Sequence, residues 1–542
     1  MTEKSCRAKE QRLRCPLCYE HVDGNLRAHM MESHGEEEFR RAVLADKARG
    51  MPDPEIGERY GISFGTLEQF ITEAYGANIS VLKRPKRIKR WQPPNFHEET
   101  TTVWSFKQRG DWATHDGRYR GNWSPYIPRN VILKYSRPGD TVLDYFVGGG
   151  TTAVEAKLLG RRCIARDINP GAVGLTLENL RFSPPSQLLG NDSFPLYEPE
   201  VSVGDARDLS DLPDGRVDLI CAHPPYAGII KYGTRIPGDL SDLSVSDFLR
   251  EMHQVAAESL RVLKPGGKCA ILIGDARKSK YVVPIGFQTI RVFLDAGFIL
   301  RELVIKRQHN CRTTGFWYTR SIQHNFLLLA HEYLPIFEKP LTKRVGEPRT
   351  PWECTLSCQI AVDQVRRIEE ENLETTTVWI FPEERLEQEV RRNLLWRFSS
   401  REDGNWAEVR LDGEDIFTRL AQRVHLVYVR WPQYHGMTES KFMDYRSTLS
   451  KVVEQSTLGR GSFLVLETMD FRGETLWPAG LIVYEDMKRH PDFSLKEIII
   501  VVPQEPSQGN PRVSTGLNPR VSTGLNTDLE IIHRYLLVYV RR

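Results

Sequence analysis

The sequence has no hydrophobic run that approaches the roughly 18 residues needed to span a membrane. Its first residues, Met1-Thr2-Glu3, do not lead into the apolar core of a signal peptide. Cysteine is scarce as well, and nine cysteines in 542 residues do not make a disulfide scaffold. Together these absences predict a cytoplasmic protein without a membrane partner.

The chain also lacks an excess of charge of one sign. Its 74 Lys and Arg residues against 71 Asp and Glu residues leave a net charge of +3, which alone indicates no nucleic-acid partner. The whole excess lies in residues 1–90, where Lys83–Arg90 carries six positive charges and no negative ones. Such a run is typical of a solvated linker or of a segment that follows a phosphate backbone. With 40% hydrophobic and 27% charged residues, the chain is globular and long enough for three or four units.

Two cysteines and two histidines lie upstream of this basic segment at a spacing that can close a tetrahedral zinc site. They are Cys15, Cys18, His29 and His34. The pattern resembles a Cys2His2 zinc finger whose loop is two residues shorter than usual, with His21 as a spare ligand candidate. We predict a zinc-finger module with structural zinc over residues 1–40, whose spacing does not decide whether it contacts DNA.

Residues 41–80 are predicted to form a helix-turn-helix. Pro54 can open a first helix, and Ser63 can cap a second one. The segment resembles homeodomain-like or sigma-factor-like helix-turn-helix segments, although an ordinary helical hairpin has the same pattern. With the finger and the basic linker of residues 81–95, it favours a nucleic-acid partner.

A buried strand that ends at Asp144 runs into the glycine turn 148–150, and a helix follows. Glycines in such a turn let the backbone approach a ligand closely at the switch point of an open α/β sheet. The next two strands end in Asp167 and Asp205, which suit ribose hydroxyls and an adenine amino group. This pattern alone predicts a nucleotide-like cofactor and does not separate it from NAD.

A fourth strand ends in His223-Pro224-Pro225-Tyr226, a rigid turn that carries an aromatic ring. With this motif, residues 96–340 resemble the S-adenosylmethionine-dependent amino methyltransferases of DNA, which modify adenine N6 or cytosine N4. The resemblance implies an α/β, Rossmann-like domain with a mostly parallel seven-stranded sheet. It also implies S-adenosylmethionine as cofactor and double-stranded DNA as substrate, and it leaves a restriction partner open.

By resemblance, the tetrapeptide is catalytic. Residue 223 and the Pro224 carbonyl accept the hydrogens of the target amino group, while Tyr226 stacks on a flipped-out base. The methyl group is already activated, so alignment supplies most of the catalysis. The cofactor-binding residues that the resemblance implies are Trp123, Ser124, Asp144, Phe146, Gly148, Gly150, Thr151, Asp167, Asn169 and Asp205.

Two residues depart from the family pattern: Tyr145 replaces a proline, and His223 replaces the usual Asp, Asn or Ser. A neutral imidazole can accept a hydrogen bond and an imidazolium cannot, so we predict activity that falls as His223 protonates below about pH 6. In the alternative, His223 is structural and the Pro224 carbonyl accepts alone. Cytosine C5 methylation is excluded, because its family carries a nucleophilic Pro-Cys pair and none of the nine cysteines follows a proline.

Residues 371–542, after a linker of residues 341–370, repeat parts of residues 96–340 in order. About 75 residues, including the glycine turn and both acid-ended strands, have no counterpart. We predict a degenerate partial copy that does not bind the cofactor by itself. It either forms an intramolecular pseudo-dimer with the catalytic unit, in a monomeric chain, or grips DNA. The matched pairs are Trp104 with Trp379, Trp123 with Trp406, His223 with Trp431, Glu302 with Glu497, and His324 with His533.

Recognition of the target is open among the N-terminal modules, the second unit and the basic aromatic loop Arg307–Arg320. The function has two rivals: an RNA methyltransferase, and a DNA-binding regulator with an inactive methyltransferase fold. We assign no function to the identical octads 510–517 and 518–525 or to the pair Cys354 and Cys358.

Overall fold

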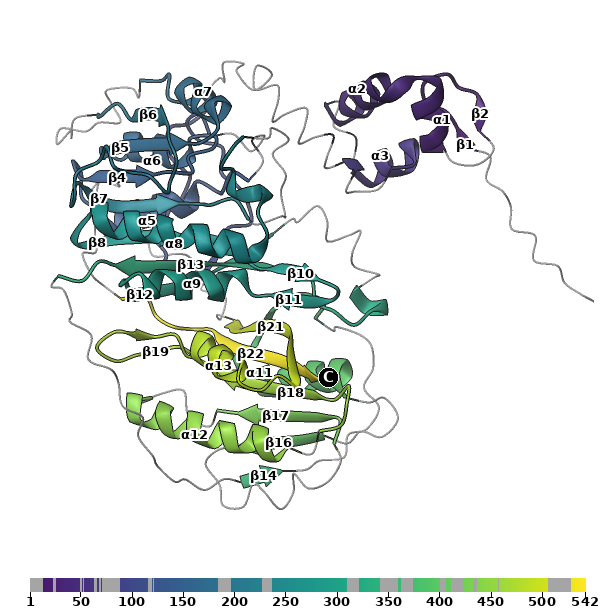
Figure 1. Ribbon diagram of the computed structural model, residues 1–542, viewed down its shortest axis with the longest axis vertical. Helices are drawn as coiled ribbons and strands as arrows, with labels where there is room; N and C mark the ends of the chain where they lie inside the picture. The colour runs from purple at the N-terminus through teal and green to yellow at the C-terminus, as the bar shows by residue number, and fades with distance from the viewer. Residues whose placement is uncertain are drawn as a thin grey trace, which may run out of the picture.

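The computed structural model contains two sheet-based units and a small N-terminal unit (Figure 1). Among the residues it describes, no helix has both the length and the apolar composition to cross a bilayer. The described residues are 13–22, 26–48, 51, 53–62, 66–67, 70, 88–115, 119, 121–183, 196–226, 236–309, 321–341, 359–361, 374–399, 406–410, 424–431, 436–456, 458–504 and 528–542.

In the N-terminal unit, the described residues form a short hairpin, three helices and part of a fourth. Its elements are β1 (Leu13–Arg14), β2 (His21–Val22), α1 (Leu26–Ser33), α2 (Gly35–Ala48) and α3 (Asp53–Tyr60). Leu26 of α1, Phe39 of α2 and Tyr60 of α3 belong to one buried core. The predicted module boundary at residue 40 is therefore wrong, because α2 runs through it and both predicted modules share that core.

The predicted helix-turn-helix is described only in its first half. α3 ends at Tyr60, and Gly61 follows with a φ of +60°, a left-handed conformation that suits glycine. Of the second helix, only residues 66–67 and 70 are described, and they are helical. The rest of that helix and residues 81–87 of the basic linker lie outside the described residues, so the contact of these segments with DNA stays a prediction.

The first large sheet has nine strands, eight of them in the order β3-β12-β13-β8-β7-β4-β5-β6. The strands are β3 (Val103–Ser105), β4 (Thr141–Asp144), β5 (Arg162–Asp167), β6 (Glu200–Val203), β7 (Val217–Ala222), β8 (Leu263–Ile271), β9 (Ile273–Gly274), β12 (Ile299–Arg307) and β13 (His331–Glu338). β13 is antiparallel to its neighbours and the other pairs are parallel. The prediction of seven strands omitted the edge strand β3 and β9, which continues the line of β8 along β13.

Helices cover both faces of this sheet. Val142 of β4 packs in the cluster that includes α5 and α6, and its neighbour Leu143 packs in the cluster that includes α8 and α9. Burial on both faces is typical of a parallel strand between two helix layers. The remaining elements are α5 (Tyr126–Tyr135), α6 (Thr151–Leu158), α7 (Pro170–Asn179), η3 (Leu240–Asp242), α8 (Val245–Val262), the hairpin β10 (Ala276–Lys278) and β11 (Tyr281–Val283), and α9 (Ile285–Asp295).

The second large sheet has seven strands in the order β14-β16-β17-β18-β22-β21-β15. They are β14 (Gln359–Ala361), β15 (Val378–Pro382), β16 (Trp406–Arg410), β17 (Leu426–Arg430), β18 (Phe463–Thr468), β21 (Phe493–Gln504) and β22 (Arg534–Arg541). The elements around it are η4 (Glu383–Arg385), α11 (Leu386–Phe398), α12 (Glu439–Gln455), the hairpin β19 (Phe471–Arg472) and β20 (Leu476–Trp477), and α13 (Ala479–Met487).

Six strands of the second sheet repeat six strands of the first in order and direction. The run β16-β17-β18-β22-β21-β15 corresponds to β4-β7-β8-β13-β12-β3. β12 and β21 even carry a register shift at the same place, between Leu300 and Glu302 and between Leu495 and Glu497. Beyond β16, the antiparallel β14 lies where the parallel β5 lies in the first sheet.

Two of the pairs matched in the sequence are wrong. Trp123 precedes α5, whereas Trp406 opens β16, which follows α11. The counterpart of His533 is His331 rather than His324, because each contacts the tyrosine hydroxyl two residues further on. The residues that the second unit lacks relative to the first fall in two connections. Three residues join β15 to α11, whereas 20 join β3 to α5 in the first unit. Likewise, 15 residues join β16 to β17, whereas 72 join β4 to β7.

The two units contact each other through reciprocal hydrogen bonds. Oγ1 of Thr102 in the first unit lies 2.9 Å from Nδ1 of His533 in the second. Oγ1 of Thr377 in the second unit lies 2.9 Å from Nδ1 of His331 in the first. A contact in which each partner supplies the same groups to the other has the isologous form of a twofold dimer interface.

Ion pairs across the contact follow the same rule. Nη2 of Arg277, in the first unit, donates to Oε2 of Glu497 at 2.5 Å. Nη2 of Arg472, in the second unit, donates to Oε2 of Glu302 at 2.7 Å. Both carboxylates are almost fully buried. The charge of each is neutralised by an arginine from the other unit.

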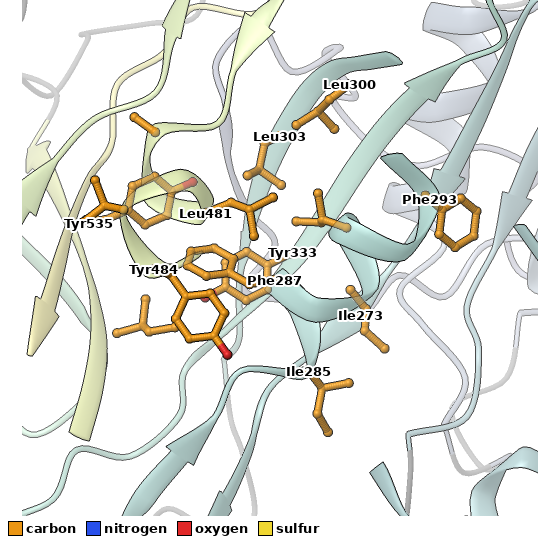
Figure 2. Close-up of a cluster of buried hydrophobic side chains, with 14 of the residues drawn as sticks. Ile273, Ile285, Phe287, Phe293, Leu300, Leu303, Tyr333, Leu481, Tyr484 and Tyr535 are labelled. Atoms are coloured by element: carbon orange, nitrogen blue, oxygen red, sulfur yellow. The ribbon is translucent and has the colours of Figure 1, made fainter. Parts of the chain in front are cut away.

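Apolar and aromatic side chains fill the space between the units (Figure 2). The ring of Phe287 in the first unit lies 5.8 Å from that of Tyr484 and 6.0 Å from that of Tyr535, both in the second unit. It also lies 5.3 Å from Tyr333. Since these side chains belong to one continuous hydrophobic cluster, the two sheets form one body rather than two domains on a linker.

Candidate active site

Two pockets open at the carboxyl ends of the strands in the first sheet, where α/β folds bind ligands. The first, here the glycine pocket, encloses about 760 Å³ including space open to solvent, and it is lined by the residues after β4, β5 and β6. The second, here the Tyr226 pocket, lies beside it and is lined by residues of the 106–124 segment, β12 and β13. His223 and Pro225 line both pockets and form a shared wall between them. A ligand in one pocket would therefore meet a ligand in the other at these two residues.

The glycine turn after β4 shapes the glycine pocket. Gly148 has a φ of +51°, and a Cβ added there would lie 2.9 Å from the ring of Tyr119. The carboxylate of Asp167 accepts hydrogen bonds at 2.9 Å from the backbone nitrogens of Gly148 and Asn169. Burial raises the pKa of Asp167 to about 6. This acid therefore joins the ends of β4 and β5 as well as facing the pocket.

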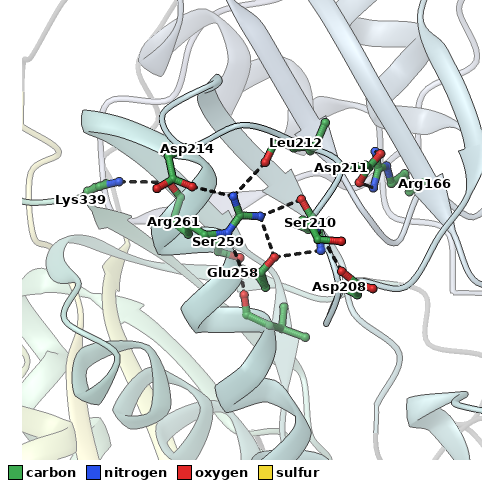
Figure 3. Close-up of polar contacts among 12 residues, drawn as sticks. Arg166, Asp208, Ser210, Asp211, Leu212, Asp214, Glu258, Ser259, Arg261 and Lys339 are labelled. Atoms are coloured by element: carbon green, nitrogen blue, oxygen red, sulfur yellow. Dashed lines mark hydrogen bonds and ion pairs between the residues drawn. The ribbon is translucent and has the colours of Figure 1, made fainter.

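Asp205, after β6, is oriented by Arg207. Its carboxylate accepts from Nη2 at 2.6 Å, from Nε at 3.0 Å and 3.2 Å, and from the backbone nitrogen of Arg207 at 2.9 Å. Arg261 of α8 fastens the same loop through the Leu212 carbonyl and Asp214 (Figure 3). Because a carboxylate has about four acceptor positions, an amino group that binds Asp205 must share one of these bonds.

Of the ten residues predicted to bind the cofactor, six are among the described residues that line the glycine pocket. They are Trp123, Phe146, Gly148, Asp167, Asn169 and Asp205. Asp144 lies buried behind the turn and accepts from the backbone nitrogen of Phe146 at 3.0 Å. Gly150, with a φ of +85°, caps α6, and Thr151 donates to Asn122. Ser124 lines the Tyr226 pocket instead.

The four residues of the predicted catalytic turn lie together in the Tyr226 pocket. His223 stacks on Trp123 with ring centroids 5.6 Å apart, and its Nε2 lies 3.0 Å from the hydroxyl of Tyr226. That hydroxyl donates to Oε1 of Glu332 at 2.7 Å, and Oε2 of Glu332 accepts from Lys306 at 2.7 Å. A polar chain thus runs from the wall between the pockets to β13 and β12.

Burial decides the protonation state of His223. It lowers the pKa of His223 to about 4, against the opposing attraction of Glu332. The pKa of Glu332 is lowered to about 2 in spite of its burial, because Lys306 and His223 lie beside it. Burial therefore moves the expected loss of activity from about pH 6 toward pH 4, because the sequence-based value took no account of burial.

Glu332 and Lys306 were not predicted from the sequence. They follow the predicted catalytic turn by 106 and 80 positions, and only the antiparallel pairing of β12 with β13 places Lys306 opposite Glu332. A signal was present, because each is a charged residue beside an apolar strand core: Lys306 follows Leu303–Ile305. Charges in such strands are rare unless paired, so the two together indicate a buried ion pair.

At the same edge of the second sheet, the described residues bring several charged side chains together. Arg430 pairs with Glu387, Glu408 and Glu467. Arg534 pairs with Glu387 at 2.6 Å and with Glu467 at 3.1 Å. An ion-pair network thus occupies the ends of β17, β18 and β22, where the first sheet has its catalytic turn and Glu332.

The four predicted metal ligands converge in the N-terminal unit. Their ligand atoms all lie within 4.8 Å of one another. Sγ of Cys15 lies 3.6 Å from Nε2 of His34, and Sγ of Cys18 lies 3.4 Å from Nε2 of His29. A tetrahedral zinc ion separates sulfur from nitrogen by about 3.5 Å, so this donor set fits zinc. His21, the spare candidate, lies on β2 outside the cluster.

The basic aromatic loop contributes its first residues to the Tyr226 pocket. Arg307 and His309 line that pocket beside Lys107 and Arg109. Residues 310–320, with the three aromatic rings of the loop, lie outside the described residues. Six cationic or imidazole side chains line the pocket, counting Lys306 and His223, which suits an anionic substrate.

Known proteins with similar sequences fall into one chemical class. Residues 66–178 match the DNA methylase family of N6 and N4 methyltransferases. A tRNA (guanine(10)-N2)-dimethyltransferase of Methanothermobacter thermautotrophicus is 36% identical over 26% of this chain and 37% of its own length. Type II methyltransferase M.MthZI of the same species is 29% identical over 24% of this chain and 42% of its own length. Type II methyltransferase M2.DpnII of Streptococcus pneumoniae is 38% identical over 14% of this chain and 27% of its own length.

These matches make part of the chain similar to the DNA methylase family and to named methyltransferases. The chain spans less than half the length of each of these relatives. Among solved structures, an S-adenosylmethionine-dependent methyltransferase from Methanosarcina mazei is 18% identical, over 38% of this chain and 96% of that one. Its TM-score of 0.27 adds nothing to the fold described above.

Proposed function

We propose that this methyltransferase transfers a methyl group from S-adenosylmethionine to the exocyclic amino group of adenine (N6) or cytosine (N4) in double-stranded DNA. The observation that carries the proposal is the meeting of the two pockets at His223 and Pro225. When bound, S-adenosylmethionine supplies an activated methyl group on its sulfonium sulfur. Two pockets that share lining residues can hold a cofactor and a base side by side, and alignment of the two is the main catalytic need of a direct transfer.

On the cofactor side, the proposal assigns each group by its position around the glycine pocket. Phe146 and the backbone of Gly148 border the space, while Asp167 and Asn169 stand at the end of β5, where ribose hydroxyls are bound. Asp205 stands at the end of β6 for the adenine ring, sharing its carboxylate with an arginine as described above. These residues fit the cofactor in size and in donor and acceptor type.

On the substrate side, the ring of Tyr226 offers a face on which a flipped-out base can stack. His223 and the Pro224 carbonyl accept the hydrogens of the target amino group, which favours a tetrahedral nitrogen with an available lone pair. The cationic side chains around the opening contact the phosphate backbone. A restriction partner stays a prediction.

The N-terminal unit is proposed to bind one structural zinc ion and to contact DNA. The zinc proposal is supported by the sulfur and nitrogen distances in the Cys15, Cys18, His29 and His34 cluster. The DNA proposal is supported by α3, the first helix of the predicted helix-turn-helix, and by the six positive charges of Lys83–Arg90 that follow in the sequence. Such a basic segment adds sequence-independent affinity that weakens with salt.

The second unit is proposed to be a truncated copy of the first that acts as a built-in dimer partner, so that the chain is a monomer. The six equivalent strands and the reciprocal contacts of Thr102 with His533 and Thr377 with His331 support this role. The alternative, a unit that grips DNA, has no comparable support. Sedimentation equilibrium of the purified chain tests the monomer, and a concentration-dependent dimer contradicts it.

The experiment that tests the activity is mass spectrometry of nucleosides from DNA of cells that express the chain. N6-methyladenine or N4-methylcytosine is expected with the intact protein and not with His223→Ala. The variant His223→Asn, which restores a residue type usual in the family, is the matched control and is expected to retain activity. If neither the intact protein nor His223→Asn modifies DNA, although both still bind S-adenosylmethionine, the result supports an inactive DNA-binding regulator instead.

RNA is the second candidate substrate, because one relative is named as a tRNA methyltransferase. Purified protein with isotope-labelled S-adenosylmethionine, given duplex DNA or structured RNA in separate reactions, separates the two. Label in the duplex alone supports the DNA proposal. Label in the RNA alone overturns it.

A further inference from the structure

The polar chain behind His223 fixes the direction of each hydrogen bond in it. Glu332 is buried and ion-paired with Lys306, so it accepts on both oxygens. The hydroxyl of Tyr226 has one hydrogen, and Glu332 receives it. The oxygen of Tyr226 is then an acceptor toward Nε2 of His223, 3.0 Å away.

The same argument settles the state of the imidazole ring. If Nε2 must donate to Tyr226 and the ring is neutral, the proton sits on Nε2 and Nδ1 holds a lone pair. Nδ1 is buried and makes no hydrogen bond of ordinary distance and angle with the described residues, although the backbone of Gly121 lies near enough to act on the ring. A buried acceptor without a well-placed partner is costly, so Nδ1 is available to a ligand.

We propose that Glu332, held by Lys306, is a positioning residue that acts through Tyr226 to keep His223 in the Nε2–H form. Nδ1 is thereby kept as the acceptor for a hydrogen of the target amino group. The inference rests on the proposed function and adds two residues on β12 and β13 to it. No covalent step is involved, because Glu332 and Lys306 only hold a proton at Nε2.

The second unit offers an internal comparison. His331 and Tyr333 of β13 have the counterparts His533 and Tyr535, with the same hydrogen bond between ring and hydroxyl. Glu332, between them, is replaced by Arg534, which pairs with acids of its own unit. The histidine and the tyrosine that face the contact between the units are thus the same in both units. The residue between them is an acid, Glu332, only in the first unit, which carries the proposed catalytic turn.

The variant Glu332→Gln reverses the direction of the hydrogen bonds from Glu332 to His223 and keeps a partner at each position. Lys306 donates only, so it turns the amide oxygen of the glutamine toward itself, and the amide nitrogen then donates to Tyr226. The hydroxyl of Tyr226 must now donate to His223, whose proton moves to Nδ1. Methyl transfer is expected to fall about 10- to 100-fold in kcat, with little change in KM for cofactor or DNA.

The test is nitrogen NMR of the full-length protein labelled in histidine, without substrate, together with steady-state kinetics. The His223→Asn spectrum identifies the signals by their loss. Protonated Nε2 is expected in the wild type and protonated Nδ1 in Glu332→Gln. The matched control is Glu338→Gln, which lies on the same strand, pairs with Lys268 at 3.0 Å and lines neither pocket. It is expected to change neither the spectrum nor kcat.

Two results would overturn the inference. The first is a wild-type proton on Nδ1, donated to the nearby backbone of Gly121, which contributes to the pKa of His223. The second is a tautomer that changes in Glu332→Gln while kcat stays the same, because the Pro224 carbonyl then accepts alone. The NMR result needs no turnover, so failure of the proposed function, seen as no transfer by the wild type, is recognised separately.

Discussion

The contact between the two units predicts that two distant arginines have the same effect on stability. Arg277 pairs with Glu497, which is 0% exposed, and Arg472 pairs with Glu302, which is 2% exposed. The perturbations are Arg277→Ala and Arg472→Ala. Each leaves one carboxylate buried without its cation and keeps the acid itself in place. Because the two pairs are reciprocal, the two losses are expected to agree within about 1 kcal/mol.

The magnitude follows from what the carboxylate can do instead. Loss of one partner of a buried pair costs about 3 to 5 kcal/mol. A glutamate can escape by taking up a proton, which at pH 7 costs about 3.7 kcal/mol from an ordinary pKa of about 4.3, and at pH 5 only about 1 kcal/mol. Burial already raises the pKa of Glu497 and Glu302, and removal of the arginine raises it further.

The sign of the pH effect is therefore fixed. A carboxyl whose folded pKa lies above its unfolded pKa destabilises the protein as pH rises from the unfolded value toward the folded one. The deficit of each variant is expected to be about 3 to 4 kcal/mol at pH 7 and to shrink toward about 1 kcal/mol at pH 5. The wild type sets the baseline at each pH.

The assay is urea unfolding of the full chain, followed by tryptophan fluorescence at pH 7 and pH 5, with the m-value compared between variants. The matched control is Arg291→Ala, whose exposed partner Asp295 lies four residues away on α9. It is expected to cost less than about 0.5 kcal/mol. A deficit that is independent of pH, or one below about 1 kcal/mol at pH 7, would refute the reasoning.

Three further predictions concern the sites. Methyl transfer is expected to stay level from pH 8 to about 5 and to fall near pH 4, where His223 protonates, and a half-loss near pH 6 contradicts this. Gly148→Ala is expected to weaken cofactor binding about tenfold in calorimetry, because φ is +51° and the Cβ meets Tyr119, so an unchanged Kd contradicts it. Chelation of zinc, or Cys18→Ala, is expected to expose the N-terminal unit to protease, whereas continued resistance argues against structural zinc.

Much of the first sheet could be predicted from the sequence because its signals are local. The strand that ends at Asp144 and the acids Asp167 and Asp205 lie where expected, at the ends of β4, β5 and β6. Local sequence does not give strand pairing, however. The edge strand β3 is three residues long and belongs to the sheet only because β12 pairs with it.

The candidate site was predicted where its residues are neighbours in the chain and missed where they are not. His223 and Tyr226 are three positions apart, whereas Glu332 reaches them through the fold. Burial was the second unpredictable quantity. An imidazole of ordinary pKa titrates near 6.5, and the wall between two pockets lowers that of His223 to about 4.

The two units have the same interface contacts and differ in the residues at the edge of the sheet where the first unit has its pockets. The interface keeps the same donors and acceptors in both units, in the Thr102 and Thr377 bonds and in the Arg277 and Arg472 pairs. At the other edge, described residues of the second sheet form ion pairs around Arg430, where the first sheet has the Tyr226 pocket. If the second unit existed to bind a cofactor or a base, the opposite pattern would be expected. Shared interface contacts beside a changed edge are what the proposed built-in dimer partner requires, because a lost partner would leave two carboxylates and an aromatic cluster uncovered.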